Sequence, residues 1–160
     1  MTIKHCLLNH QYERAISIVA ELEEMGRQDK INNLESFLVI LLIHLIKIQV
    51  EKRVTRSWRS SILNSLREIQ KRNKLGKKSQ YIQKNQWLEH FDATYPDAIF
   101  QAADEACGEI EIKQLKSLLD LARLQSITLK LLKLTYNLDA DSLVEFVSDR
   151  FPVGYLSTEM

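Results

Sequence analysis

The chain is poor in the residues that interrupt helices. Its 160 residues include four glycines and two prolines. β-Sandwiches and barrels need many turn residues, whereas long helices exclude both types, so this scarcity favours helices. Cys6 and Cys107 are too few for the disulfide framework of a small secreted domain. The N-terminal residues contain no apolar signal core, and we therefore expect a cytoplasmic protein with reduced thiols.

A large net charge and a long apolar run are also missing. The formal charge of +1 and the hydrophobic content of 45% differ from the composition of disordered chains. The longest apolar stretch, Phe37 to Val50, is interrupted by His44, Lys47 and Gln49 and is shorter than the roughly 20 residues that span a bilayer. We expect no membrane segment and one domain over residues 1–160.

The spacing of apolar residues predicts an all-α fold. Apolar side chains recur every three or four positions from Tyr12 to Met25 and again from Gln28 to Lys52. Gly26 lies between the two stripes, where it either ends the first helix or bends a longer one. Residues 37–48 are apolar on nearly every face, which indicates a long central helix packed on several sides.

Further helices are expected along the rest of the chain. Residues 127–136 fit a helix or a strand and are interpreted as a helix, because no partner strands are evident. Asp139 is a candidate N-cap for the last helix. The expected helices run from Thr55 or Ser57 to about Asn73, from Tyr81 to about Phe91 with Trp87, over Asp97 to Cys107 between Pro96 and Gly108, through Leu115, Leu118, Leu119 and Ala122, and from Ala140 to Arg150. A loop is expected at 74–79. We predict an all-α, single-domain helical bundle of about five to seven helices with a long, nearly all-apolar central helix.

Three segments resemble a known family. They are Leu22-Glu23-Glu24-Met25-Gly26, Leu41-Leu42-Ile43-His44-Leu45-Ile46-Lys47 and Arg56-Ser57-Trp58-Arg59. Together they are similar to domain-of-unknown-function family 29, a bacterial, all-helical family with no established biochemical role, over roughly residues 16–107. The chain departs from the family pattern in lacking an acidic and aromatic lead-in, in having Ile48 where an aromatic residue is usual, and in the stretch after Gly108. The resemblance implies a helical core over 16–107, on which we expect the helices of 109–160 to pack.

Motifs for catalysis, metals and cofactors are missing from the sequence. His5 and His10 are five residues apart, which places them on different faces of a helix, and no Glu-x-x-His pair is present. The four glycines are too far apart for a phosphate-binding loop. Cys107 is expected near a helix C-terminus, which disfavours a reactive thiolate. We expect no metal, no cofactor and no enzymatic activity.

Two residues of the expected core stand out. His44 lies in the most apolar helix and is interpreted as a neutral histidine bonded to a neighbouring carbonyl or carboxylate, the alternative being a buried base or ligand. Trp58 is predicted on the inward face of the third helix, with Ile62, Leu66 and Ile69.

The charges are distributed unevenly. The segment from Lys47 to Lys84 holds twelve lysines and arginines against Glu51 and Glu68, for a net charge of +10, while the rest of the chain carries −9. If the third helix begins early enough, five of these cations share an arc of roughly 60° at about 100° per residue. This basic face can be a solvated surface, can meet the acidic half of the same fold or of a second subunit, or can bind phosphates. The leading hypothesis is a non-enzymatic interaction module that binds itself or another protein. The alternative is a nucleic-acid-binding accessory protein, and an uncharacterised enzyme ranks third. The candidate basic face is Arg53, Arg56, Arg59, Arg67, Lys71 and Lys74.

Overall fold

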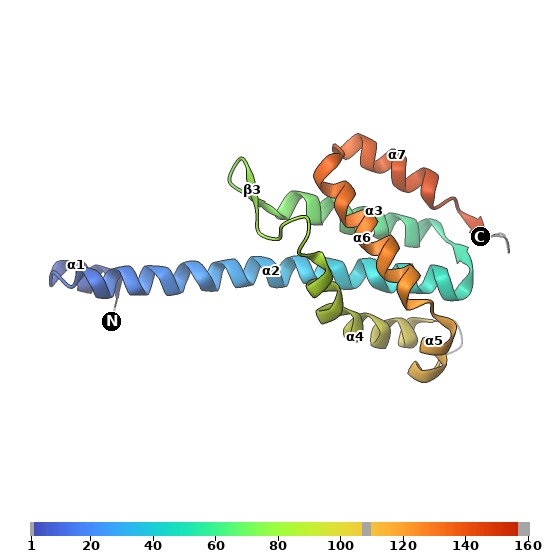
Figure 1. Ribbon diagram of the computed structural model, residues 1–160, viewed down its shortest axis with the longest axis horizontal. Coiled ribbons are helices and arrows are strands. Elements are labelled where there is room, and N and C mark those ends of the chain that lie inside the picture. The colour runs from blue at the N-terminus through green and yellow to red at the C-terminus, as the bar shows by residue number, and fades with distance from the viewer. Residues whose placement is uncertain (1, 107–109, 157–160) are drawn as a thin grey trace.

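A computed structural model describes residues 2–106 and 110–156, and seven helices contain 77% of this part of the chain. The fold is all-α, as predicted. One helix of 40 residues, α2, forms the axis of the molecule (Figure 1). The other helices from α3 onward gather around its C-terminal half, whereas its N-terminal half extends away from them with only α1 beside it.

Helix α2 spans Tyr12–Glu51 without a break. Gly26 lies inside it, so the glycine neither ends the helix nor separates two helices. The helix ends where Lys52 adopts a left-handed conformation, with φ of 55°. Ahead of it, α1 (Ile3–Leu8) is capped by Thr2 and folds back on the start of α2, where Cys6 and Ala15 are buried.

Helix α3 spans Arg56–Arg72 and begins at Thr55, one of the two candidate caps, whose hydroxyl accepts a hydrogen bond of 3.1 Å from the Trp58 amide. Ile62, Leu66 and Ile69 are buried against α2, but Trp58 is only half-buried. The expected loop at 74–79 is a hairpin of two short strands, β2 (Lys74–Leu75) and β3 (Ser79–Gln80). Its turn contains Gly76 at φ of 69°, a conformation that glycine adopts without a steric penalty.

The prediction of two helices between Tyr81 and Cys107 is wrong. A single helix, α4, spans Trp87–Glu105 and contains Pro96 in its interior. Proline interrupts isolated helices, but here buried side chains on both sides of it, among them Phe91 and Ile99, anchor the helix to the core. Residues 81–86 form a turn, and Cys107 and Gly108 lie outside the described residues.

The C-terminal part contains three helices. Helix α5 (Ile112–Leu118) stops at Leu119, so the apolar stripe from Leu115 to Ala122 does not belong to one helix as expected. Helix α6 (Leu121–Asn137) confirms the helical interpretation of 127–136, and α7 (Ala140–Arg150) begins at the predicted cap, Asp139. The chain then returns to the end of α2, where β4 (Gly154–Tyr155) pairs antiparallel with β1 (Arg53–Val54).

The core surrounds the C-terminal half of α2. Helices α3 and α7 lie on one side of it, α4 lies on the other, and α6 crosses between them (Figure 1). Among the described residues, α2 is the one helix long and apolar enough to cross a membrane by length and composition. Its most apolar segment, Leu34–Ile48, carries eight of its nine buried residues and contacts α3, α4 and α6.

Candidate interaction surfaces

The predicted basic face is shorter in the structure than on the helical wheel. Helix α3 does not include Arg53 or Lys74, which lie in β1 and β2, so the shared arc applies to Arg56, Arg67 and Lys71. These three side chains are exposed on the side of α3 that also carries Ser60 and Asn64. The hairpin places further exposed cations near the end of the helix: Lys74, Lys77 and Lys78.

Two members of the predicted face are held by neighbouring groups or partly covered. Arg53 donates to Glu51 at 3.3 Å, and its guanidinium lies 5.0 Å from the centre of the Trp58 ring. Lys47, which approaches the same ring to 5.7 Å, forms an ion pair of 3.0 Å with Glu105 and so connects α2 with α4. Arg59 is half-buried. The aromatic ring of Trp58 therefore serves to hold cations at the edge of the core.

His44 is half-buried on α2. Its Nδ1 lies 2.8 Å from the carbonyl oxygen of Ile40, and because a carbonyl only accepts, Nδ1 carries the proton. Burial holds the pKa of His44 below its ordinary value, and the hydrogen bond to Ile40 opposes this shift. The histidine is thus bonded in the manner predicted for a neutral residue. His90, on α4, contacts a residue of another helix: its Nδ1 lies 3.1 Å from Oε1 of Glu35 on α2.

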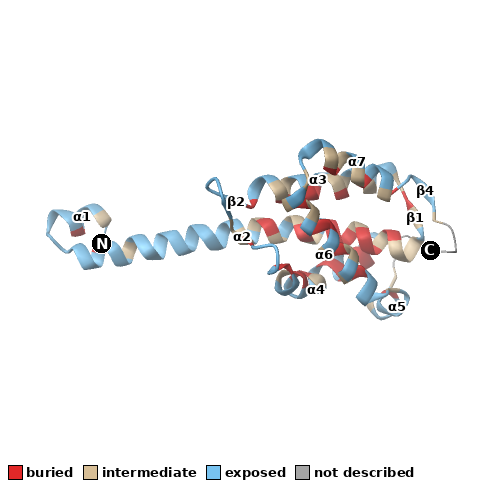
Figure 2. Ribbon diagram, turned by 45° about the horizontal axis from the view of Figure 1, so that its top comes forward, coloured by how far each residue is buried: buried red, intermediate tan, exposed pale blue. Residues whose placement is uncertain are grey.

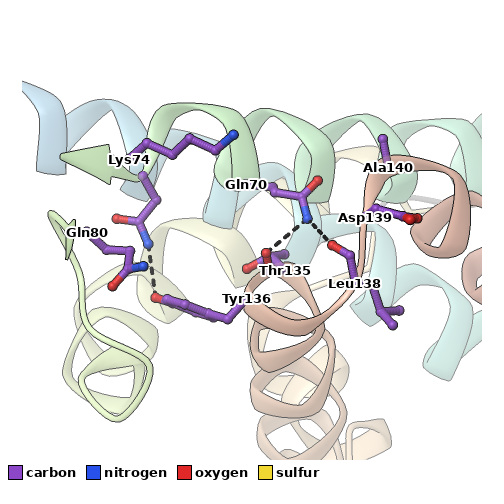
Figure 3. A pocket seen from close by; sticks show the side chains of 9 residues that line it. Gln70, Lys74, Gln80, Thr135, Tyr136, Leu138, Asp139 and Ala140 are labelled. Carbon is purple, nitrogen blue, oxygen red and sulfur yellow. Dashed lines mark hydrogen bonds between the residues drawn. The ribbon is translucent and has the colours of Figure 1, made fainter. Parts of the chain in front are cut away.

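A polar cavity of about 420 Å³ lies where the end of α3, the hairpin and the turn between α6 and α7 meet (Figure 3). Gln70 closes one side by donating to the carbonyl oxygens of Thr135 and Leu138, at 2.9 and 2.6 Å. Tyr136 closes another: its hydroxyl accepts from Asn73 at 2.9 Å and from Trp87 at 2.6 Å. The cavity wall is therefore made largely of groups that already hold the structure together.

The hydroxyl of Tyr136 joins three segments that are far apart in the sequence. It donates to the carbonyl oxygen of Ile82 at 2.6 Å, and the buried Asn73 bonds both the amide and the carbonyl of that residue. Burial raises the pKa of Tyr136, so its proton remains available for this bond. Within the described residues, every buried side-chain nitrogen or oxygen has a partner, and no three His, Cys, Asp or Glu side chains gather as a metal site would require.

A row of exposed apolar side chains follows the N-terminal half of α2. Every residue from Val19 to Lys30 is exposed (Figure 2). We call residues 3–30 the arm and its exposed apolar side chains the arm stripe. Leu22 is 53% exposed and Met25 is 63% exposed. The arm stripe consists of Leu7, Leu8, Tyr12, Ile16, Val19, Leu22 and Met25.

The arm stripe occupies one side of the helix. At about 100° per residue, the α2 members fall on one half of the helical circumference, together with Gly26. Glu21 and Glu24 lie on the other half. Over the first turns the same apolar side is partly covered by α1, which buries Ala15. The apolar surface thus continues beyond the end of its only cover in the described chain.

Comparison with known proteins agrees with the sequence motifs. The family described as Domain of unknown function DUF29 matches residues 15–118, which is more than half of the chain. The chain belongs to the DUF29 family. No curated protein and no solved structure matches it.

The DUF29 region covers α2 from Ala15, together with α3, the hairpin, α4 and α5. It therefore extends to Leu118, past the boundary at residue 107 that the motifs indicated. Most of the arm stripe, the basic side of α3 and His44 lie within it. Helix α1 precedes the DUF29 region, and α6 and α7 follow it and pack against α3.

The contacts that sequence reasoning missed join residues far apart in the chain. Lys47 and Glu105 are on different helices, and Tyr136 meets groups 54 and 63 positions away. No local sequence pattern predicts such pairs. The exposed arm stripe was missed for another reason: the spacing of its apolar residues indicates a packed helix, and the spacing is the same whether or not a partner is present.

Proposed function

We propose that the protein is a non-enzymatic helical interaction module, and that the arm stripe is the surface by which it binds a helix of a protein partner. The observation that carries the proposal is the row of exposed apolar side chains on a helix that leaves the core. Contiguous apolar surface of this kind is characteristic of interaction sites. A helix with apolar anchors three and four residues apart is also the shape that docks against another helix.

The energetics of the arm support a partner. From Val19 to Lys30 the helix has no buried residue, so no core contact stabilises these three turns. Helices depend mainly on tertiary packing of their apolar face, and an isolated stretch of this length is marginal in water. Gly26 makes it weaker, by roughly 0.5–1 kcal/mol relative to alanine. A partner on the arm stripe would supply the missing contacts.

The charges of the arm favour a protein over a lipid surface. Helices that lie on membranes carry Lys and Arg opposite their apolar side, where they meet anionic headgroups. Between Tyr12 and Lys30 the arm carries five carboxylates against three cations, and Glu13, Glu21 and Glu24 lie opposite the apolar side. This excess of negative charge is unfavourable at an anionic bilayer.

Gln70, Asn73 and Tyr136 at the polar cavity, and His44 on α2, are already hydrogen-bonded within the chain. This supports the non-enzymatic part of the proposal.

A photo-crosslinking amino acid placed at Leu22 tests this function in cells that produce the protein. The matched control has the same group at Glu24, two residues along and about 160° around the helix. We expect one discrete adduct from position 22, lost when Met25 is also changed to Glu, and none from position 24. Equal yields from both positions, or no adduct from either, would contradict the proposal.

The basic side of α3 supports a second candidate, binding of nucleic acid. Arg56, Arg67 and Lys71 are exposed and make no ion pair within the described chain, and phosphate contacts need such groups. Arg67→Glu with Lys71→Glu should then abolish binding to a generic duplex, measured by fluorescence anisotropy, and the wild-type affinity should fall steeply with salt. Ser60→Ala with Asn64→Ala, on the same side, is the control. No binding by the wild type at low salt excludes this candidate.

A further inference from the structure

Resting on the proposed function of the arm stripe, we propose that its occupant is the arm of a second copy of this chain, aligned antiparallel. The midpoint of the pair lies between Glu21 and Leu22. Positions whose numbers add to 43 are then level with each other on the two helices. A twofold axis makes every such contact occur twice, so the surface must complement itself.

The charges at the two ends of the arm meet this requirement. Arg14 of one copy is level with Asp29 of the other, and on the helical wheel both lie toward the same edge of the arm stripe, the edge of Met25. In a twofold antiparallel pair like edges face each other. Glu13 is likewise level with Lys30. Parallel pairing in register would instead make each residue level with its own copy, so Arg14 and Asp29 would remain 15 positions apart along the pair and could not meet.

These four charged side chains have no competing role within the described structure. Glu13, Arg14, Asp29 and Lys30 are all exposed, and none forms an ion pair there. Gly26 adds a steric argument. A β-carbon built on it would have no atom within 4 Å, so its side of the helix is open. In the antiparallel pair Gly26 is level with Ser17 and next to Ile16, whose bulky side chain needs that space.

Helix α1 is part of the same surface. It packs antiparallel to the first turns of α2 and leaves Leu7 48% and Leu8 70% exposed beside the tip of the arm stripe. Two arms in the proposed alignment bring four helices together, with the tip of each arm near the base of the other. These leucines then gain the apolar neighbours that they lack in one copy.

A charge swap tests both the occupant and the alignment. Sedimentation equilibrium over a wide concentration range should show a monomer–dimer equilibrium for the wild type. Arg14→Asp alone, or Asp29→Arg alone, places like charges opposite each other twice and should weaken the dimer on the order of tenfold. The double swap, Arg14→Asp with Asp29→Arg, restores both pairs and should return the dissociation constant to near the wild-type value. Circular dichroism of each variant should show that the part of the chain that follows the arm, which we call the body, remains folded.

The possible failures of the two proposals are distinguishable. A dimer that the double swap does not rescue overturns the antiparallel alignment. A wild type that stays monomeric at every concentration overturns the inference that a second copy occupies the arm stripe. The proposed function of the arm stripe is then decided separately, by whether the crosslinker at Leu22 captures a different protein. Dimerisation that survives Leu22→Glu with Met25→Glu overturns the arm as its surface, and with it this inference.

Discussion

The two halves of α2 differ in what surrounds them, although both carry many apolar side chains. From Leu34 onward the helix contacts α3, α4 and α6 and its leucines are inaccessible to solvent. From Val19 to Lys30 every residue of the same helix is exposed. An apolar side chain stabilises a fold only when another part of the structure covers it. From Val19 to Lys30 the arm therefore presents apolar side chains that add little to the stability of one copy.

The largest expected effect compares one leucine from each half. Leu41 is fully buried and Leu22 is 53% exposed. Leu41→Ala should lower the free energy of unfolding by about 2–5 kcal/mol, because it removes buried methyl groups and leaves a cavity. Leu22→Ala should change it by less than about 0.5 kcal/mol. Urea denaturation at low protein concentration, where the arm is unpaired, measures both.

Raising the protein concentration sharpens this comparison. If the arms pair, association raises the free energy of unfolding of the wild type at high concentration, and Leu22→Ala should then lower it. The loss caused by Leu41→Ala should be the same at every concentration. A large cost of Leu22→Ala at low concentration would mean that the arm packs on its own body, contrary to the structure.

The second comparison concerns two tyrosines. Tyr136 is half-buried in the body and binds Trp87, Asn73 and Ile82, whereas the exposed Tyr12 of the arm bonds only His10, at 3.0 Å. Tyr136→Phe leaves the indole N–H of the buried Trp87 without its partner, and we expect a loss of about 1–3 kcal/mol. Tyr12→Phe should cost less than about 0.5 kcal/mol. Thermal unfolding of both variants measures the difference, and equal costs would show that water replaces the Tyr136 hydroxyl.

A smaller effect is expected at the junction of α2 and α3. Thr55→Ala removes the hydroxyl that accepts from the Trp58 amide, and caps of this kind contribute about 1 kcal/mol. Thr55→Ser keeps the oxygen and is the matched control, which should retain most of the stability. The melting temperature should therefore fall for the alanine variant and stay close to wild type for serine. Equal losses in both variants would assign the effect to the methyl group of the threonine.

The elements of the body that local chemistry determines could be predicted from the sequence. Short polar residues before an apolar stripe predict Asp139 as one cap and Thr55 or Ser57 as another, and the structure has caps at Asp139 and Thr55. The all-α fold and the central helix followed from periodicity. Pro96 shows the opposite case: its local preference predicts a helix start, but buried residues on both sides of it override that preference and the helix continues through it.

The candidate surfaces were harder to predict, since they depend on what lies beside a helix. The wheel placed Arg53 on the basic face of α3, but the helix begins three residues later and Arg53 contacts Trp58 and Glu51 instead. For the arm, the stripe of Ile16, Val19 and Leu22 was visible in the sequence as an apolar side. Only the structure shows that α1 covers part of that side and that the other helices lie elsewhere, which leaves the rest of it exposed.

His44 gives the smallest expected effect, and it concerns the side of α2 that the body covers least. It lies one turn after Ile40, which is 38% exposed, so the helix is packed here on some sides only. Because burial lowers the pKa of His44 in the folded protein, the unfolded chain binds a proton more readily, and stability falls as the pH decreases below about 6.5. Above that value the histidine is neutral in both states and contributes no slope.

Replacing the histidine should remove this dependence. His44→Gln lacks the ionisable ring, so the difference in unfolding free energy between wild type and variant should shrink as the pH is lowered from about 7 towards 5, as the wild type loses its advantage. Denaturation at several pH values measures that difference, in which the contributions of all other groups cancel. We also expect both proteins to be free of stoichiometric metal. A constant difference across this range would mean that His44 is as accessible to water in the folded protein as in the unfolded chain. This side of the C-terminal half of α2 would then be as exposed as the arm.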